Sequence, residues 1–441
     1  MAEALPPLAD ALRRAARRFG TPLYVTDQAS LEAAAATIRE AFPDPWLRAF
    51  SLKANDVTAV VERVSRLGFD ANVVSRGEWS IARRAGLPNS RITLEGVGKT
   101  DADLRAAVDS AAAGEPLRWI AIESLDEAGV LTELAGDRFR RARGRSAGAD
   151  RARPLDVLFR LNPEVTPETH AGLAVGRSGS KFGMTASELT EAVDLVARTG
   201  GLVARGIHLH VGSQLRAVNA WRDGARRALA LLALVAGTRE RFDTLDVGGG
   251  FPVTDPNESS PEPERFAREL PELIAALPSD RRPERLAIEP GRALVARAGF
   301  VVGRVLHVRD RPERQVVLDV GMTELIRPAL YGANHPIAAL TSLGRAIDGL
   351  GSTDSAVGGF SNEGFEPAVV EGPICESTDH LGEHSLPPLR RGDLVAIRDA
   401  GAYGTSLGST YNGRPRPPQV IVERDGSLTL ARRRGSLAAL G

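Results

Sequence analysis

The sequence predicts a (β/α)8 barrel followed by a mostly β domain, and three observations lead to that prediction. Eight short apolar runs alternate with Ala/Leu/Arg segments of helical period between about residues 46 and 290. Polar or glycine-rich residues follow most of these runs. Beyond about residue 293, apolar and polar residues alternate between turn residues, as in β-strands.

The eight predicted barrel strands are rich in β-branched residues and lie at 48–51, 70–74, 92–94, 119–122, 156–161, 206–210, 244–247 and 286–289. Eight strands alternating with helices over roughly 250 residues match the length and rhythm of such a barrel. A doubly wound open sheet is the alternative. The spread of polar residues favours the barrel, because a barrel assembles its site from loops after many different strands.

The second domain is predicted to contain strands at 300–308, 314–318, 394–398 and 419–422. We expect the barrel to span residues 25–292 and the β-rich domain to combine residues 1–24 with 293–441. Two stretches, 136–153 and 348–365, have the composition of loops.

Composition excludes several classes of protein. The chain has 441 residues, with 56 basic and 56 acidic side chains, so no overall field draws it to nucleic acid or to a membrane surface. No stretch is long and apolar enough to span a bilayer, and the N-terminus lacks a secretory pattern. A single cysteine, Cys375, forms no internal disulfide. We therefore expect a cytoplasmic protein with a small-molecule substrate.

Lysine is scarce, since only Lys53, Lys99 and Lys181 are lysines among the 56 basic residues. Arginine can supply surface charge but cannot replace a lysine amine that condenses with a carbonyl as a Schiff base. Lys53 directly follows the first predicted strand and is the best candidate for that chemistry. A bias toward arginine, with ordinary ion-pair roles for the lysines, is the alternative.

Three consecutive glycines, Gly248, Gly249 and Gly250, follow the seventh predicted strand. Without side chains, their backbone N–H groups can wrap an anionic group closely. In barrels of this kind, phosphate usually lies at the loops after strands seven and eight. A simple tight turn is the competing explanation.

Glu289 and Arg292 belong to a Glu-Pro-Gly-Arg motif at the end of the eighth predicted strand. A carboxylate facing a pyridine nitrogen would keep that nitrogen protonated and make the ring an electron sink. The arginine could bind a phosphate or a carboxylate through two hydrogen bonds. A structural Glu–Arg pair is the alternative.

His208 and His210 lie two residues apart in the sixth predicted strand, so their side chains point to the same side. A two-histidine metal site needs a third ligand, and no further histidine or carboxylate lies nearby in the sequence. We therefore expect no metal here. A ring stacked on a flat cofactor fits better, with Ser213 available to a phosphate.

Together these features resemble the alanine-racemase-fold pyridoxal-phosphate decarboxylases, and among them most closely the diaminopimelate decarboxylases. The resemblance covers about residues 20–425, in order. Its motifs are Tyr24-Val25, Ser51-Leu52-Lys53-Ala54-Asn55, Ser180-Lys181-Phe182-Gly183, the run from His208 to Gln214, Gly248-Gly249-Gly250-Phe251-Pro252, Glu289-Pro290-Gly291-Arg292, Gly372-Pro373-Ile374-Cys375-Glu376-Ser377 and Gly401-Ala402-Tyr403-Gly404.

The resemblance implies that pyridoxal 5'-phosphate is the cofactor and that Lys53 binds it as a Schiff base. His210 would stack on its ring, and Glu289 would bond its pyridine nitrogen. The residues implied to hold the phosphate or to lie beside it are Ser213, Gly248, Gly249, Gly250, Gly291, Arg292 and Tyr403.

The resemblance also implies a substrate site shared between two chains of a homodimer. Arg327 and Tyr331 would bind the distal carboxylate of an amino-acid substrate, with Arg292 and Tyr403 nearby, and the β-rich domain would supply substrate and dimer contacts. Glu376 would read the distal amine. Cys375 would reach the partner subunit's site, and either Cys375 or Lys53 would return a proton after loss of CO2.

The implied activity is decarboxylation of meso-diaminopimelate to L-lysine, as in lysine biosynthesis. Val320-Gly321 and Asn334 depart from the family pattern, and the change at Asn334, three residues beyond Tyr331, puts the substrate in question more than the reaction. A decarboxylase of secondary metabolism that acts on another amino acid, or on one bound to an acyl carrier protein, is the alternative. A non-catalytic regulator of the same fold is disfavoured, because Lys53, Glu289 and Cys375 are all retained.

Overall fold

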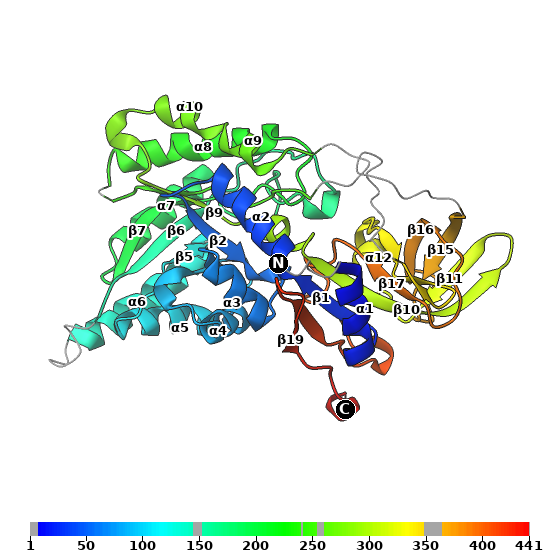
Figure 1. Ribbon diagram of the computed structural model, residues 1–441. Coiled ribbons are helices and arrows are strands. Elements are labelled where there is room, and N and C mark those ends of the chain that lie inside the picture. The colour runs from blue at the N-terminus through cyan, green and yellow to red at the C-terminus, as the bar shows by residue number, and fades with distance from the viewer. Residues whose placement is uncertain (1–7, 144–151, 240, 254–259, 348–363, 441) are drawn as a thin grey trace, which may run out of the picture.

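The chain folds into a closed eight-stranded parallel barrel beside a nine-stranded sheet, which confirms the predicted fold class (Figure 1). The computed structural model describes residues 8–143, 152–239, 241–253, 260–347 and 364–440. In Figure 1 the barrel and its surrounding helices lie on the left, and most of the second sheet lies on the right.

The barrel strands fall within a few residues of their predicted positions. They are β2 (Leu47–Ser51), β3 (Asp70–Val73), β4 (Ile92–Leu94), β5 (Trp119–Ile122), β6 (Leu155–Arg160), β7 (Leu202–His208), β8 (Thr244–Asp246) and β9 (Arg285–Ile288). Each strand pairs in parallel with the next, and β2 pairs with β9 to close the ring. The open-sheet alternative is therefore wrong.

Helices cover the outside of the barrel. They are α2 (Gln28–Ala41), α3 (Thr58–Arg66), α4 (Arg76–Arg84), α5 (Asp101–Ala112), α6 (Leu125–Arg143), α7 (Ala186–Ala197), α8 (Asn219–Ala236), α9 (Pro263–Ala267), α10 (Leu270–Ala275) and α11 (Arg292–Val295). Several begin at a side-chain cap: Ser75 accepts the Glu78 N–H, and Thr100 and Thr185 form capping boxes. These caps fix where three of the loops at the barrel mouth end.

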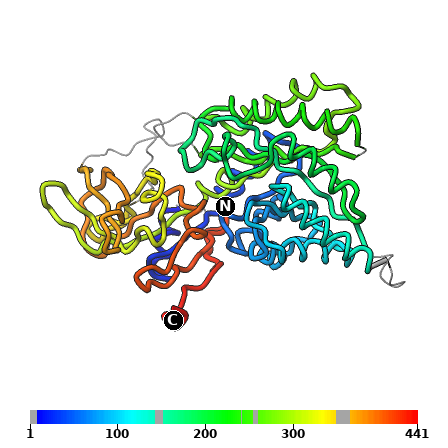
Figure 2. The backbone as a smooth tube through the Cα atoms, turned by 180° about the vertical axis from the view of Figure 1, so that it is seen from behind, coloured from blue at the N-terminus to red at the C-terminus, as the bar shows by residue number. Residues whose placement is uncertain are grey.

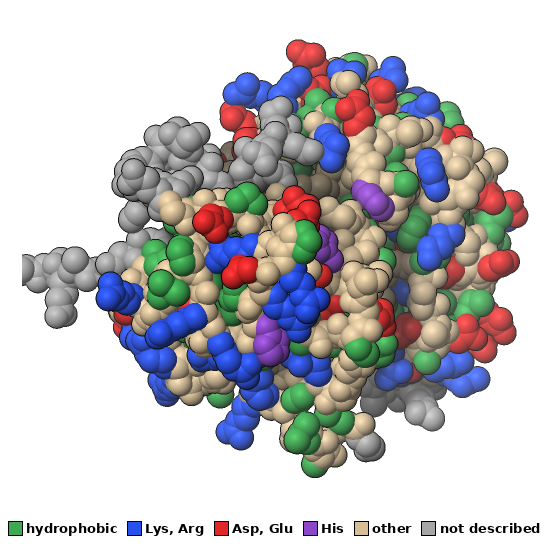
Figure 3. All heavy atoms as spheres, turned by 90° about the vertical axis from the view of Figure 1, so that its right-hand side faces the viewer, with side chains coloured by type: hydrophobic (Ala, Val, Ile, Leu, Met, Phe, Trp, Pro, Cys, Tyr) green, Lys and Arg blue, Asp and Glu red, His purple; other side chains and the backbone are tan. Residues whose placement is uncertain are grey.

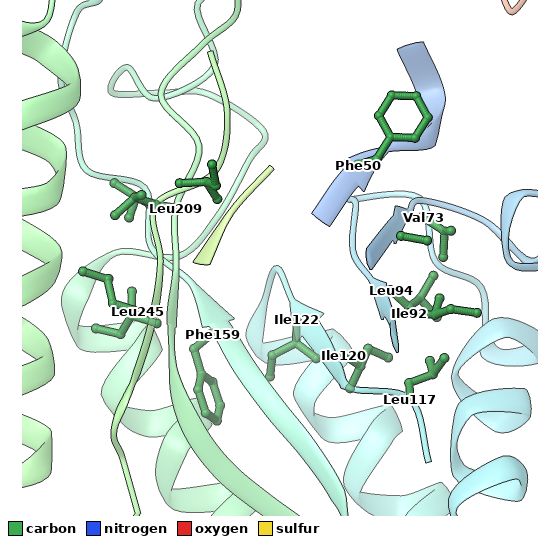
Figure 4. Close-up of a cluster of buried hydrophobic side chains, with 14 of the residues drawn as sticks. Phe50, Val73, Ile92, Leu94, Leu117, Ile120, Ile122, Phe159, Leu209 and Leu245 are labelled. Carbon is green, nitrogen blue, oxygen red and sulfur yellow. The ribbon is translucent and has the colours of Figure 1, made fainter. Parts of the chain in front are cut away.

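The main core lies between the barrel strands and the helices. Ile120 and Ile122 of β5 face this layer with Phe159 of β6 (Figure 4). The alternate β5 residues, Trp119 and Ala121, instead pack inside the barrel. This alternation is the period of two expected of a strand buried on both faces.

The second sheet combines both ends of the chain. Its strands are β1 (Leu23–Asp27), β10 (Gly299–Asp310), β11 (Arg314–Leu318), β12 (Ile337–Ala339), β15 (Glu366–Glu371), β16 (His380–Leu386), β17 (Leu394–Ile397), β18 (Gln419–Val422) and β19 (Leu428–Arg432). Strand β1 lies between β10 and β18, so N- and C-terminal segments run side by side (Figure 2). The four strands predicted in this domain correspond to β10, β11, β17 and β18.

Three smaller elements complete the second domain. They are α1 (Leu8–Phe19), α12 (Arg327–Tyr331) and the hairpin of β13 (Thr341–Ser342) and β14 (Arg345–Ala346). Basic side chains gather on the outer face of this domain (Figure 3). Its exposed arginines include Arg309, Arg311, Arg390 and Arg391.

The prediction of a loop at 136–153 is wrong at its start, because α6 continues to Arg143. The apolar residues Leu131, Ala135 and Phe139 recur every four residues and are buried, which extends the helical stripe through the arginine-rich segment. Residues 144–151 lie outside the described part of the chain, as does most of the second predicted loop, 348–363.

Candidate active site

Lys53 lies at the end of β2, in a single 3-10 turn formed by Leu52–Ala54. Residues of the second domain hold the backbone of this turn: Ser406 Oγ donates to the Lys53 carbonyl oxygen at 2.9 Å, and Tyr403 N donates to the Ala54 carbonyl oxygen at 2.7 Å. The Lys53 side chain is exposed. The lysine selected from the sequence therefore stands where the barrel mouth meets the second domain.

The three-glycine loop after β8 packs too closely for side chains. Gly248 and Gly250 have φ angles of 68° and 106°, in the region that favours glycine. A Cβ on Gly248 would lie 2.4 Å from the Leu209 carbonyl oxygen, and one on Gly250 would lie 2.8 Å from the Gly212 carbonyl oxygen. This bare backbone suits close approach of an anionic group, as a cofactor phosphate requires.

Ser213, Arg292 and Tyr403 adjoin that loop. Arg292 Nη2 donates to Ser213 Oγ at 3.3 Å, and the Arg292 guanidinium lies over the Tyr403 ring, 4.9 Å from its centre. Arg292 is only 6% exposed, and its Nε has no hydrogen-bond partner among the described residues. A buried, incompletely paired cation beside the glycine loop fits a phosphate or carboxylate ligand.

His210 faces the same loop. Its Nδ1 accepts a hydrogen bond from Gly249 N at 3.1 Å. Burial lowers the pKa of His210 well below its ordinary value, and the nearby positive charges of Lys53 and Arg160 lower it further. The ring is therefore neutral with its proton on Nε2, and its orientation is set by the glycine loop.

Glu289 belongs to a buried polar cluster inside the barrel. Asn72 Nδ2 donates to Glu289 Oε1 at 2.5 Å. His208 Nε2 lies 3.5 Å from Glu289 Oε1 and 3.3 Å from Glu95 Oε2. Burial and the Glu289 carboxylate raise the pKa of Glu95 to about 8, and they raise that of Asp246 well above its usual range. An ionised carboxylate in this cluster therefore disfavours ionisation of the neighbouring carboxyl groups.

This buried polar cluster could not be predicted from the sequence. No metal is predicted at His208 and His210 because no carboxylate lies near them in the sequence, but barrel closure brings two glutamates to His208. Burial lowers the pKa of His208 to about 4, so its ring is neutral. The expectation that no carboxylate would lie near His208 is therefore wrong, and the absence of a metal stays a prediction.

A cavity of about 370 Å³ lies between the barrel loops and the second domain. It brings together three predicted residues, Arg292, Arg327 and Tyr331, although α12 lies beyond the barrel in the sequence. Burial and the neighbouring Arg292 lower the pKa of Arg327 to about 10. Three arginines and one carboxylate, Asp399, are among the described lining residues, so the cavity wall is net positive.

Cys375 and Glu376 lie in the turn between β15 and β16 and are exposed. Asn412 Nδ2 donates to Cys375 Sγ at 3.5 Å, and the Tyr411 hydroxyl donates to Glu376 Oε1. Neither Cys375 nor Glu376 is among the described residues that line the cavity. The single chain thus does not unite these two predicted residues with the cavity.

Two residues that contact the predicted site, Asn72 and His335, were not predicted from the sequence. Asn72 is a polar residue between the apolar Ala71 and Val73 of β3, and that interruption was its only signal. His335 lies 2.9 Å from Arg327 through its Nε2, yet its position in the sequence marked it only as the neighbour of Asn334.

The barrel, the lysine at its mouth and the glycine loop beside it define the class of (β/α)8-barrel enzymes that use pyridoxal phosphate. The family model of the pyridoxal-dependent decarboxylases, pyridoxal binding domain, matches residues 28–296. The chain therefore belongs to the pyridoxal-dependent decarboxylase family.

Relatives match almost the whole chain. A diaminopimelate decarboxylase of Aquifex aeolicus is 33% identical over 428 residues, which is 96% of this chain and 91% of the relative. One of Actinosynnema pretiosum subsp. auranticum is 36% identical over 427 residues, 95% of this chain and 87% of the relative.

Among solved structures, the chain is similar to a diaminopimelate decarboxylase from Helicobacter pylori complexed with L-lysine. The TM-score is 0.82 at 27% identity, and the match covers 97% of this chain and 98% of the other. Across the described residues, every helix is too short or too polar to cross a bilayer.

Proposed function

We propose that this chain is a pyridoxal-phosphate-dependent carboxy-lyase that converts meso-diaminopimelate to L-lysine and CO2. The observation that carries the proposal is the placement of Arg292 and Arg327 on one cavity beside the barrel mouth. No ion pair joins either guanidinium to an acidic side chain among the described residues, and the Nε atoms of both lack hydrogen-bond partners there. Such a wall selects a substrate that keeps a carboxylate far from the reacting carbon.

The residues that would hold the cofactor are Lys53, His210, Glu289, Ser213 and the loop of Gly248, Gly249 and Gly250, with Gly291 and Tyr403 beside them. Pyridoxal phosphate, when bound, supplies an electron sink for the electrons left by the departing carboxyl group. Glu289 would hold a proton on the ring nitrogen, with Asn72 fixing its carboxylate. His210 would contribute a neutral ring face held by Gly249.

The remaining roles concern the substrate. Arg327 and Tyr331 would bind the distal carboxylate, because they line the same cavity as Arg292. Glu376 would bind the distal amine, and Cys375 would donate a proton to the reacting carbon. Both lie exposed in the described chain and outside the lining of its cavity, which supports their action in the site of the partner subunit of a homodimer.

The same proposal covers the division of the chain. Residues 25–292 would carry the cofactor, and residues 1–24 and 293–441 would supply substrate and dimer contacts. Cross-domain hydrogen bonds from Tyr403 and Ser406 to the turn of Lys53 support this division of labour. A chain with one cysteine forms no internal disulfide, which fits the cytoplasmic location included in the proposal.

The test is release of CO2 by the cofactor-loaded protein from meso-diaminopimelate, compared with lysine, ornithine, glutamate and amino acids bound to an acyl carrier protein. The proposal expects CO2 from meso-diaminopimelate, with one L-lysine formed per CO2. Release of CO2 from another of these substrates, with none from meso-diaminopimelate, would be consistent with a decarboxylase but would overturn the proposed substrate. A substrate analogue that lacks the distal carboxylate should not be turned over, because no negative charge would then pair with the net positive wall of the cavity.

A further inference from the structure

We propose that His335 is a positioning residue that fixes the Arg327 guanidinium for the distal carboxylate of the substrate. The inference rests on the proposed function in one respect, since it takes Arg327 as the residue that binds that carboxylate. His335 lies just before β12, eight residues after Arg327, and only 1% of it is exposed.

The two partners of His335 determine its tautomer. Its Nε2 lies 2.9 Å from Arg327 Nη1, and its Nδ1 lies 3.0 Å from the Arg398 carbonyl oxygen. A guanidinium nitrogen can only donate a hydrogen bond, and a carbonyl oxygen can only accept one. His335 must therefore accept at Nε2 and carry its proton at Nδ1, and no other protonation state satisfies both contacts.

The surroundings keep this ring neutral. Burial and then the positive charge of Arg327 lower the pKa of His335 to about 3, so the acceptor at Nε2 survives throughout the neutral range. A protonated ring would turn an N–H toward the guanidinium and break the contact. His335 therefore orients Arg327 without neutralising its charge. A carboxylate in the same place would compete with the substrate carboxylate for that charge.

The contact occupies one side of the guanidinium and leaves another available. Arg327 Nη1 is engaged by His335, whereas Nε has no partner among the described residues. The Nε and Nη2 donors form the side-on edge of the guanidinium fork, which matches the two oxygens of a carboxylate. Beside it, the Tyr331 ring meets the His170 ring edge-on at 5.6 Å.

His335 also lines the cavity, but both of its ring nitrogens are already engaged by Arg327 and the Arg398 carbonyl. A direct hydrogen bond to substrate would require it to release one of them. Action through Arg327 is therefore the role that the geometry assigns.

Two substitutions separate positioning from a merely structural role. In His335→Gln the amide oxygen can replace Nε2 as the acceptor for Arg327, whereas in His335→Asn the shorter amide can reach only the Arg398 carbonyl. Because a hydrogen bond to a charged group is lost, His335→Asn should raise the KM for meso-diaminopimelate about tenfold, with kcat within about threefold of wild type. His335→Gln should keep both constants within about threefold.

His384 supplies the matched control, because it lies on β16, does not line the described cavity and contacts the Leu381 carbonyl oxygen. His384→Asn should leave KM unchanged. Equal KM effects of the Gln and Asn variants at His335, or a fall in kcat with an unchanged KM in His335→Asn, would overturn the positioning role.

A second measurement does not depend on turnover. The 15N chemical shifts of the histidine ring nitrogens in wild type, assigned with His335→Gln, should show His335 protonated at Nδ1 and unprotonated at Nε2. Inhibition should follow the same logic: His335→Asn should weaken L-lysine, which keeps a carboxylate, and leave cadaverine, which has none, unchanged.

The two proposals fail in different ways. Absence of CO2 release from meso-diaminopimelate by wild type would sink the proposed substrate, and the ring-nitrogen shifts would still decide the role of His335. A proton on Nε2 of His335 would overturn the inference whatever the substrate.

Discussion

His210 accepts the backbone N–H of Gly249 at Nδ1, which ties the orientation of the histidine ring to the three-glycine loop. The ring and the loop come from the ends of neighbouring strands, β7 and β8. A change in the path of the loop should therefore disturb both the backbone that we propose to bind the phosphate and the ring face that we propose to meet the cofactor.

Gly248→Ala tests this coupling. Its Cβ would meet the Leu209 carbonyl oxygen at 2.4 Å, in a backbone conformation with φ of 68°. The loop must shift, so we expect the dissociation constant for pyridoxal phosphate to rise by about tenfold or more. Equilibrium titration of the cofactor-free protein would measure it.

Gly68→Ala is the matched control, because Gly68 has a φ of 92° but nothing within 4 Å of its Cβ position. Gly68→Ala introduces the backbone strain without a steric clash, so it should cost about 1 kcal/mol of stability without changing cofactor affinity. Equal loss of cofactor affinity in the two variants would refute a specific role for the loop.

Glu95 should make the stability of the cofactor-free protein depend on pH. Its pKa is raised from 4.5 to about 8, so between these values the folded chain binds more protons than the unfolded chain. The stabilising contribution is therefore complete below pH 4.5 and is lost as pH rises to about 8. Glu95→Gln, which mimics the protonated acid, should lose less stability over this interval than wild type.

Urea unfolding at pH 5 and pH 8 would measure this difference. The exposed residue Glu115 provides the control, and Glu115→Gln should follow wild type at both pH values. A free energy of unfolding that changes equally with pH in wild type and Glu95→Gln would show that Glu95 is not protonated in the folded chain.

Shared sites predict complementation between two inactive variants. Lys53→Ala should lack the cofactor lysine, and Cys375→Ala should lose on the order of 10²-fold in kcat if the thiol is the general acid. Mixed after reversible dissociation, half of the dimers would pair one chain of each kind, and each such dimer would hold one intact site. Activity should therefore recover to about a quarter of wild type.

Recovery would require the Lys53 and the Cys375 of each site to come from different chains. Mixed variants that stay as inactive as the separate ones, in dimers shown to have exchanged subunits, would place Cys375 and Lys53 in the same chain's site or deny the thiol its role.

The sequence predicted features that are encoded locally. Each barrel strand is an apolar run between turn residues, so all eight could be located, and Lys53 stood out because arginine fills nearly every other basic position. The end of helix α6 was predicted too early, because arginines interrupt its apolar stripe, which ends with the buried Phe139.

Features that depend on tertiary closure could not be predicted. Glu95, His208 and Glu289 come from or directly follow β4, β7 and β9, and only the closed barrel brings them together. The contact between His335 and Arg327 is close in sequence, but the partner that fixes the ring tautomer, Arg398, lies 63 residues further along.

The proposed active site is tested most directly by identifying the lysine that carries the cofactor. The Lys99 side chain is buried and its Nζ lies 2.9 Å from Glu127 Oε1, and the Lys181 amine lies over the Phe182 ring, so both amines have structural contacts. Borohydride reduction of the cofactor-loaded protein, followed by peptide mass spectrometry, can distinguish the three lysines. We expect a pyridoxyl phosphate group on Lys53 alone, and modification of Lys99 or Lys181 with Lys53 unmodified would rule out Lys53 as the cofactor lysine.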